Sequence, residues 1–242
     1  LMLPFLSSAQ TDIAKKADEL LTAYAKQDQF SGAVLIAKDG KVVFEKGYGY
    51  ADREKKVANT PQTEFRIGSV TKQFTAALIM QLQEQGKLSV KDRLRKYLPD
   101  YPKGDSITIE NLLNHTSGIP SITSMKQYYQ SWMKEPATHE LSISRFKDEP
   151  LKFVPGSKYE YSNSNYILLS YLAEKISGKS FEDLLNAQVV DKLKLKQTGI
   201  DKTDRVSASK AKGYQASPED DYAPARFVEM SVLTRAGAMY ST

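Results

Sequence analysis

The chain has 242 residues, of which 40% are hydrophobic and 26% charged, with a formal net charge of +5 and a pI of about 9.0. This composition is typical of a globular protein of one or two domains. Basic and acidic residues are interspersed and no aromatic-interleaved basic stripe is present, so no nucleic-acid partner is expected. The absence of cysteine excludes disulfides, thiol catalysis and cysteine-ligated metals. With only two histidines, His115 and His139, nucleophilic catalysis must use another base or one of these alone.

The N-terminal segment 1–9 begins with apolar residues and ends with small ones. Ser7 and Ala9 stand at the −3 and −1 positions of a cleavage before Gln10, which resembles the end of a secretory signal peptide. The alternative is a short apolar N-terminal strand. We expect an exported protein, periplasmic or extracellular. No transmembrane segment is expected, because no run reaches 18 apolar residues.

Periodicity predicts a helix over 10–28, followed by two β-rich runs, 33–37 and 41–45, around Asp39-Gly40. Asp-Gly between such runs is a strong hairpin signal. A hairpin alone makes no stable sheet, and the chain supplies few further strands. The later elements expected are short helices capped by Ser89 and Thr108, helical pieces near 124–134 and 138–148, helices over 164–177 and from Ser180 to about Leu193, and a short strand near 232–240.

Ser69 and Lys72 form an S-x-x-K pattern at the start of an apolar helix that runs to about Gln85. Residues at i and i+3 share a helix face. A serine there also feels the positive end of the helix dipole, and burial lowers the pKa of a lysine until it accepts a proton. Four other matches, which look solvent-facing, occur at Ser131–Lys134, Ser144–Lys147, Ser207–Lys210 and Ser209–Lys212. The pattern alone therefore leaves a structural role for Ser69 open.

Tyr161 and Asn163 form the single Y-x-N in the chain, between the Pro155-Gly156 turn and a helix. A tyrosine at such a place can relay a proton to a leaving group, and an asparagine can hydrogen-bond a substrate amide through both donor and acceptor. The alternative is a core tyrosine with an asparagine cap on the following helix.

Several segments occur in an order found in a known family. They are Ser31-Gly32-Ala33-Val34 with the hairpin, Phe65 to Lys72, Leu112 to Ile119, Pro155-Gly156 with Tyr159 to Asn163, Lys212-Gly213-Tyr214, and Ala236 to Thr242. From about Phe30 to Thr242 the sequence thus resembles the class C β-lactamase and penicillin-binding-protein-like serine hydrolases, the β-lactamase-related family.

The resemblance implies an α+β, β-lactamase/transpeptidase-like fold, with an antiparallel sheet flanked by helices, an all-helical domain, and the site between them. It divides the chain into the signal remnant 1–9, an incomplete α/β domain from 10–65 and 200–242, and a mainly helical domain over 66–199. Ser69 corresponds to the acylated nucleophile, whose backbone N–H forms half of the oxyanion hole. Lys72 corresponds to the base, Tyr161 to the acid/base, and Asn163 to the substrate-amide contact. No metal or organic cofactor is implied.

The family's third motif, Lys or His, then Thr or Ser, then Gly, is absent from this sequence. That strand supplies the second oxyanion donor, whose loss costs about 10²–10³ in rate. We therefore expect the chain to lack C-terminal strands of the sheet and to be an N-terminal portion of the protein. The rest would lie in a second polypeptide, which completes the sheet and active site, or be lost by proteolysis or truncation.

Two local patterns imitate catalytic motifs. Glu182 to Asn186 resembles the E-x-x-L-N loop of some β-lactamases, but it follows the helix cap Ser180, which favours a surface carboxylate. His115 to Gly118 resembles a catalytic histidine loop, but its place at a helix end favours a turn with a buried, hydrogen-bonded histidine.

Two functions are left open. The first is a serine hydrolase acting on β-lactams, D-Ala-D-Ala-type cell-wall peptides or small esters and amides. The second is a catalytically silent binding protein, or an inactive N-terminal fragment, on the same fold.

Overall fold

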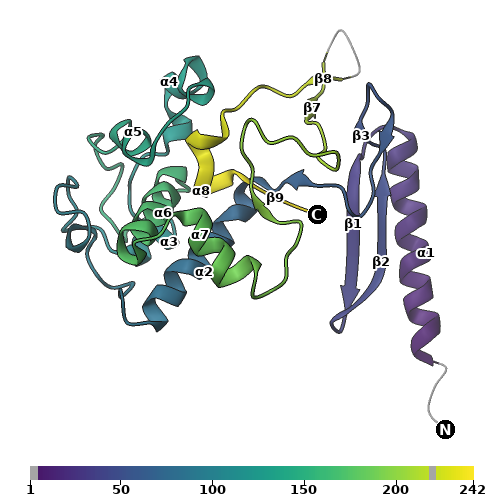
Figure 1. The fold of residues 1–242 in the computed structure, drawn as a ribbon, viewed down its shortest axis with the longest axis horizontal. Coiled ribbons are helices and arrows are strands. Elements are labelled where there is room, and N and C mark those ends of the chain that lie inside the picture. The colour runs from purple at the N-terminus through teal and green to yellow at the C-terminus, as the bar shows by residue number, and fades with distance from the viewer. Residues whose placement is uncertain (1–4, 218–221) are drawn as a thin grey trace. The chain divides into compact units, whose positions relative to one another are not determined.

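The computed structural model describes residues 5–217 and 222–242 (Figure 1). Helices and antiparallel strands both occur, which confirms the α+β class. The chain forms two compact units: the first comprises Leu1–Phe65, Val206–Arg226 and Thr242, and the second Arg66–Arg205 and Phe227–Ser241. Residues 227–241 belong to the mainly helical unit, whereas the sequence predicts them in the α/β domain. The division into domains stays a prediction.

The first unit is built on a β-hairpin. Its elements are α1 (Phe5–Lys26), β1 (Gly32–Lys38), β2 (Lys41–Tyr48), β3 (Tyr50–Asp52), β4 (Val57–Ala58), β7 (Tyr214–Gln215) and β8 (Ala223–Pro224). β1 and β2 pair antiparallel as predicted. Asp39 and Gly40 have φ of 52° and 72°, the left-handed conformation that a two-residue hairpin turn of this hand requires.

Helix α1 lies along the hairpin and is tied to it by Asp18 (Figure 1). Asp18 accepts hydrogen bonds from Lys46 Nζ at 2.6 Å and from the Tyr48 hydroxyl at 2.7 Å. Among the described residues, β1 and β2 pair only with each other, so this helix supplies much of the support that the hairpin has there. The helix begins before the predicted residue 10. Residues 5–9 of the predicted signal remnant form its first turns, and residues 1–4 lie outside the described part, so the signal peptide stays a prediction.

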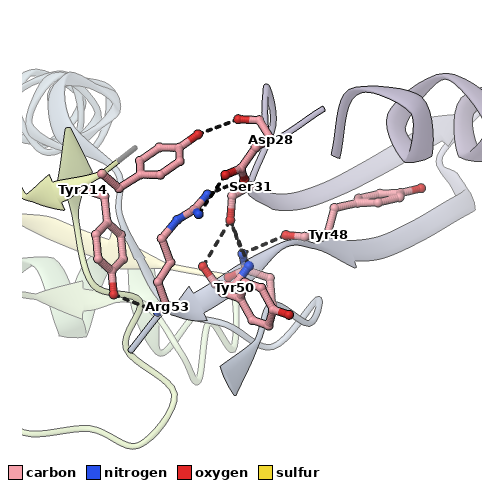
Figure 2. Close-up of polar contacts among 8 residues, drawn as sticks. Asp28, Ser31, Tyr48, Tyr50, Arg53 and Tyr214 are labelled. Atoms are coloured by element: carbon pink, nitrogen blue, oxygen red, sulfur yellow. Dashed lines mark hydrogen bonds and ion pairs between the residues drawn. The ribbon is translucent and has the colours of Figure 1, made fainter. Parts of the chain in front are cut away.

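A second polar cluster of this unit is centred on Arg53 (Figure 2). Its guanidinium donates to both carboxylate oxygens of Asp28, at 3.0 and 2.5 Å, and lies 3.5 Å from the ring centroid of Tyr222. The Arg53 backbone N–H donates to the Tyr214 hydroxyl at 2.8 Å. The cluster therefore joins segments that are far apart in the chain: 161 positions separate Arg53 from Tyr214, and 194 separate Asp28, in the loop after α1, from Tyr222.

The second unit is mainly helical. Its elements are α2 (Thr71–Glu84), α3 (Ile109–Leu113), α4 (Lys126–Gln130), α5 (His139–Ser144), α6 (Asn163–Ser177), α7 (Phe181–Leu185), β6 (Gly199–Ile200), α8 (Thr234–Gly237) and β9 (Met239–Ser241), with β5 (Phe65–Arg66) at the change between the units. α2 and α6 pack against each other in its core. The fully buried Ile79 of α2 and Leu168 of α6 belong to that core.

The ends of these helices follow their capping residues. The Thr108 side chain accepts the Asn111 N–H in a capping box, the Ser180 side chain accepts the Asp183 N–H, and Gly178 ends α6 with φ of 68°. The Ser180 helix is shorter than predicted, because the chain continues from α7 into a π-helix over Asn186–Val190. The strand predicted near 232–240 is confined to β9, which pairs with β6.

The helix predicted after Ser89 is wrong. Only a 3₁₀ turn, Leu94–Lys96, forms there. The Leu94 N–H donates to the Ile107 carbonyl at 2.8 Å, and Arg93 forms a bridge with Thr108. The backbone groups that a helix needs are therefore used in pairing with a segment further along the chain.

Candidate active site

The four residues predicted for the site lie at the starts of α2 and α6. Ser69 belongs to a 3₁₀ turn, Gly68–Val70, which directly precedes α2, and Lys72 lies in the first turn of that helix. Tyr161 lies two residues before α6, and Asn163 is its first residue. Because α2 and α6 pack together, their N-terminal ends bring side chains from distant parts of the sequence into contact.

Ser69 is exposed and has two polar neighbours. Its Oγ lies 2.6 Å from the Tyr161 hydroxyl, where either oxygen can be the donor. Lys72 Nζ donates to Ser69 Oγ at 3.2 Å. Both distances are within reach of direct proton transfer, so an accessible hydroxyl is held between a phenol and an amine.

Lys72 is buried, with 6% of its surface exposed. Besides Ser69, its Nζ donates to Asn163 Oδ1 at 2.8 Å and to the Ala236 carbonyl at 2.7 Å. Burial lowers the pKa of Lys72 to about 8, because the charged ammonium loses hydration. At pH 7, about one tenth of such an amine is neutral and able to accept a proton.

Burial separates Lys72 from the other lysines in S-x-x-K matches. Lys134 and Lys212 are exposed, and Glu54 and Asp52 bind the Lys212 ammonium and raise its pKa. Lys147 and Lys210 are half-buried, so the expectation that all four face solvent is wrong for these two. Among the five, only Lys72 is buried.

Asn163 bridges two groups through its side-chain amide. Its Oδ1 accepts from Lys72, and its Nδ2 donates to Thr123 Oγ1 at 2.9 Å. Sequence reasoning missed Thr123 and the Ala236 carbonyl. No side-chain pattern could identify a backbone carbonyl, although Ala236 lies in a segment that carries the family resemblance.

His115 lies beside the site and is 8% exposed. Its Nδ1 accepts the Ser162 N–H at 3.1 Å, and its ring centroid is 4.5 Å from that of Tyr161. Burial, and secondarily the nearby Lys72 charge, lower the pKa of His115 to about 4. The structure therefore agrees with a buried, hydrogen-bonded turn.

The remaining candidates lie elsewhere. His139 is buried, and its Nδ1 lies 2.8 Å from a carboxylate oxygen of Glu174. Glu182 pairs with Lys202 at 3.1 Å on the surface, as predicted. Over residues 5–217 and 222–242, no three His, Asp or Glu side chains gather in a group that could hold a metal ion. Nor is any helix in that part of the chain long and apolar enough to cross a membrane.

Comparisons with known proteins extend over nearly the whole chain. The Beta-lactamase family model matches residues 17–242. The teichoic acid D-alanine hydrolase of Staphylococcus aureus is 34% identical over 200 residues, which are 83% of this chain and 47% of that protein. The chain spans about half the length of the curated relatives it matches.

Solved structures agree with this similarity. The penicillin binding protein from Bacillus halodurans superposes with a TM-score of 0.80 at 29% identity, over 92% of this chain and 68% of that one. The D-amino acid amidase from Ochrobactrum anthropi SV3, complexed with L-phenylalanine amide, gives a TM-score of 0.73 at 27% identity, over 87% and 60%. These similarities confirm the β-lactamase/transpeptidase-like fold.

Proposed function

Because this chain belongs to the β-lactamase family, we propose that it carries the nucleophile of a serine hydrolase that works through an acyl-enzyme on Ser69. One observation carries the proposal. The exposed Ser69 hydroxyl is 2.6 Å from the Tyr161 hydroxyl and 3.2 Å from the buried Lys72 amine. A serine is a weak nucleophile alone and needs an adjacent base, and both neighbours can serve as one.

In the first half of the reaction, Ser69 Oγ attacks the substrate carbonyl carbon. Neutral Lys72 accepts the hydroxyl proton as the new C–O bond forms, and the carbonyl oxygen becomes an oxyanion beside the Ser69 N–H. When the tetrahedral intermediate collapses, the bond to the leaving group breaks. Tyr161 donates a proton to that group and regains one from Lys72, which leaves an acyl-Ser69 ester.

In the second half, water takes the place of the leaving group. Lys72, neutral again, takes the phenol proton of Tyr161, which in turn removes a proton from water as the water oxygen attacks the ester carbonyl. When the tetrahedral intermediate collapses, Tyr161 donates a proton to Ser69 Oγ and regains one from Lys72, and the acyl group departs as a carboxylic acid. Asn163 binds the amide of the substrate's acyl part, which requires its contact with Thr123 or Lys72 to be shared or exchanged. These roles require no metal or organic cofactor.

The names of three relatives support a substrate that contains a D-amino acid or a β-lactam. One is named as a teichoic acid D-alanine hydrolase, another as a D-amino acid amidase, and a third as a penicillin binding protein. We therefore propose D-alanyl esters or amides of the cell wall as substrates, with β-lactams as acylating analogues. Such substrates lie outside the cytoplasm, which agrees with the signal-like N-terminus and with export. The relatives named above give no support for a second polypeptide.

Covalent labelling tests the proposal directly. Full-length protein is incubated with a fluorescent penicillin, a fluorophosphonate and a D-alanyl ester, and the adduct is located by peptide mass spectrometry. We expect labelling on Ser69 that Ser69→Ala abolishes. Ser144→Ala is the matched control, because Ser144 is also exposed and also lies three residues before a lysine, but its hydroxyl donates to the Leu141 carbonyl and its lysine is only half-buried. Failure of all three probes to label the wild-type protein would instead indicate a silent binding protein.

A further inference from the structure

The loop that begins at His115 is bonded repeatedly to the segment that carries Tyr161. The Gly156 N–H donates to the Thr116 carbonyl, and the Ser117 hydroxyl donates to Asn165 Oδ1 at 2.7 Å. Asn165 is fully buried. The start of α6 and its approach are therefore built against this loop rather than held by the helix alone.

His115 accepts hydrogen bonds from the backbone on both sides of Tyr161. The Glu160 N–H donates to the His115 carbonyl at 3.0 Å, and the Ser162 N–H donates to His115 Nδ1 at 3.1 Å. Glu160 and Ser162 are the two chain neighbours of Tyr161. Two amide groups of one short segment thus bind one residue, which fixes the backbone from which the tyrosine ring projects.

The imidazole also contacts the Tyr161 ring itself. The two ring centroids are 4.5 Å apart with planes inclined by 35°. A second ring, Tyr166, lies 5.2 Å from the imidazole, and its hydroxyl donates to the Leu113 carbonyl at 3.0 Å. Lys72 Nζ lies 4.9 Å from the Tyr161 centroid and 5.5 Å from that of Tyr166. The imidazole therefore restricts the ring whose hydroxyl meets Ser69.

We propose that His115 is the positioning residue for Tyr161, with an imidazole that accepts the Ser162 N–H and packs against the tyrosine ring so that its hydroxyl stays within hydrogen-bond distance of Ser69. The inference rests on the proposed roles of Ser69 and Tyr161. His115 itself does not touch Ser69 in any described contact, so its effect on the reaction passes through Tyr161.

The arrangement requires an unprotonated Nδ1. A proton on that nitrogen would face the Ser162 N–H, donor against donor, and would break the bond. The titratable side chains that face His115 are Lys72, Tyr159, Tyr161 and Tyr166, and no described contact places a carboxylate against the imidazole. The low pKa of His115, about 4, agrees with this environment.

Two substitutions test the hydrogen-bond acceptor and the aromatic ring of His115 one at a time. His115→Asn places an amide oxygen where it can accept the Ser162 N–H, and asparagine tolerates the His115 φ of 60°. His115→Phe keeps a ring but removes the acceptor. We expect His115→Phe to lower kcat about 100-fold with KM changed less than about threefold, because displacement of a reacting group by about 1 Å has a cost of that size. His115→Asn should recover kcat to within about tenfold of the wild type.

His139→Phe is the matched control, since it changes the chain's other buried histidine in the same way. This variant should have a lower Tm but the wild-type kcat, when kcat is measured at a temperature at which the variant is folded. The inference is overturned if folded His115→Phe keeps the wild-type kcat. It is equally overturned if His115→Asn and His115→Phe lose kcat to the same extent, because the acceptor would then have no part in positioning.

A second measurement does not depend on turnover. ¹⁵N NMR of the two histidines, assigned with His139→Phe, should place the His115 proton on Nε2 at pH 6, with Nδ1 unprotonated. The ring-flip rate of Tyr161 should rise in His115→Asn, where the packed ring is lost. A His115 that is protonated at pH 6 overturns the inference, as does an unchanged flip rate. If wild-type Ser69 accepts no acyl group, the proposed function fails, and these two readouts still decide the structural claim.

Discussion

Removal of one oxygen atom, in Tyr161→Phe, isolates the hydroxyl that faces Ser69. The aromatic contacts should persist, because the ring centroid stays 4.5 Å from that of His115 and 4.9 Å from Lys72 Nζ. Tyr161 is 40% exposed, so the free energy of unfolding should change by no more than about 0.5 kcal/mol. The only described hydrogen bond lost is the 2.6 Å contact with Ser69 Oγ.

A positioned acid or base contributes about 10²–10⁴ in rate, which corresponds to about 3–5 kcal/mol of activation free energy. We expect acylation of full-length protein by a D-alanyl or p-nitrophenyl ester, followed by stopped-flow absorbance, to slow by that factor in Tyr161→Phe. Tyr129→Phe serves as the control, since Tyr129 is 59% exposed and packs edge-on against Tyr128. An acylation rate within about threefold of the wild type would refute the role given to the Tyr161 hydroxyl.

Three further outcomes follow. The acylation rate should rise with pH through about 8, because Lys72 loses its proton there. Lys72→Arg stays charged and should remove this rise. A wild-type acylation rate that does not change with pH would contradict the role of Lys72 as the base. The pKa of His115 is about 4 when folded and 6.5 ordinarily, so the unfolded chain binds the proton first as pH falls from 6.5 to 4. The free energy of unfolding should therefore fall across this window, and less steeply in His115→Asn, as denaturant titrations at several pH values would test. Gly118→Ala should lower the free energy of unfolding by at least about 2 kcal/mol, as measured by thermal unfolding. The φ of Gly118 is 77°, and the added Cβ would lie 2.4 Å from the Phe153 carbonyl oxygen. An unchanged Tm would show that the loop relaxes freely.

Local chemistry explains what could be predicted from the sequence. The Asp39-Gly40 turn and the glycine at the end of α6 depend on φ/ψ preferences of a few neighbouring residues. The i, i+3 spacing of Ser69 and Lys72 likewise needs only the geometry of one helical turn. The contact between Ser69 and Tyr161 spans 92 positions, so no periodicity predicts it, and the family resemblance was needed to pair them.

The features that sequence reasoning missed depend on backbone groups or on distant pairing. The Ala236 carbonyl binds Lys72, yet its side chain carries no polar atom. The predicted helix after Ser89 gave way to a 3₁₀ turn because Leu94 donates to Ile107 instead. The sequence predicts a buried turn residue at His115, but its two hydrogen bonds around Tyr161 join it to a segment more than 40 positions away, which no local pattern predicts.

The central claim is that Ser69, activated by Lys72 and Tyr161, takes up the acyl group. Its most direct test is the intact mass of full-length protein after reaction with a D-alanyl ester or a penicillin, with the adduct mapped by peptide fragmentation. The account predicts one added acyl group per chain, on Ser69, and none in Ser69→Ala. An adduct on another residue, or acylation that persists in Ser69→Ala, would contradict it.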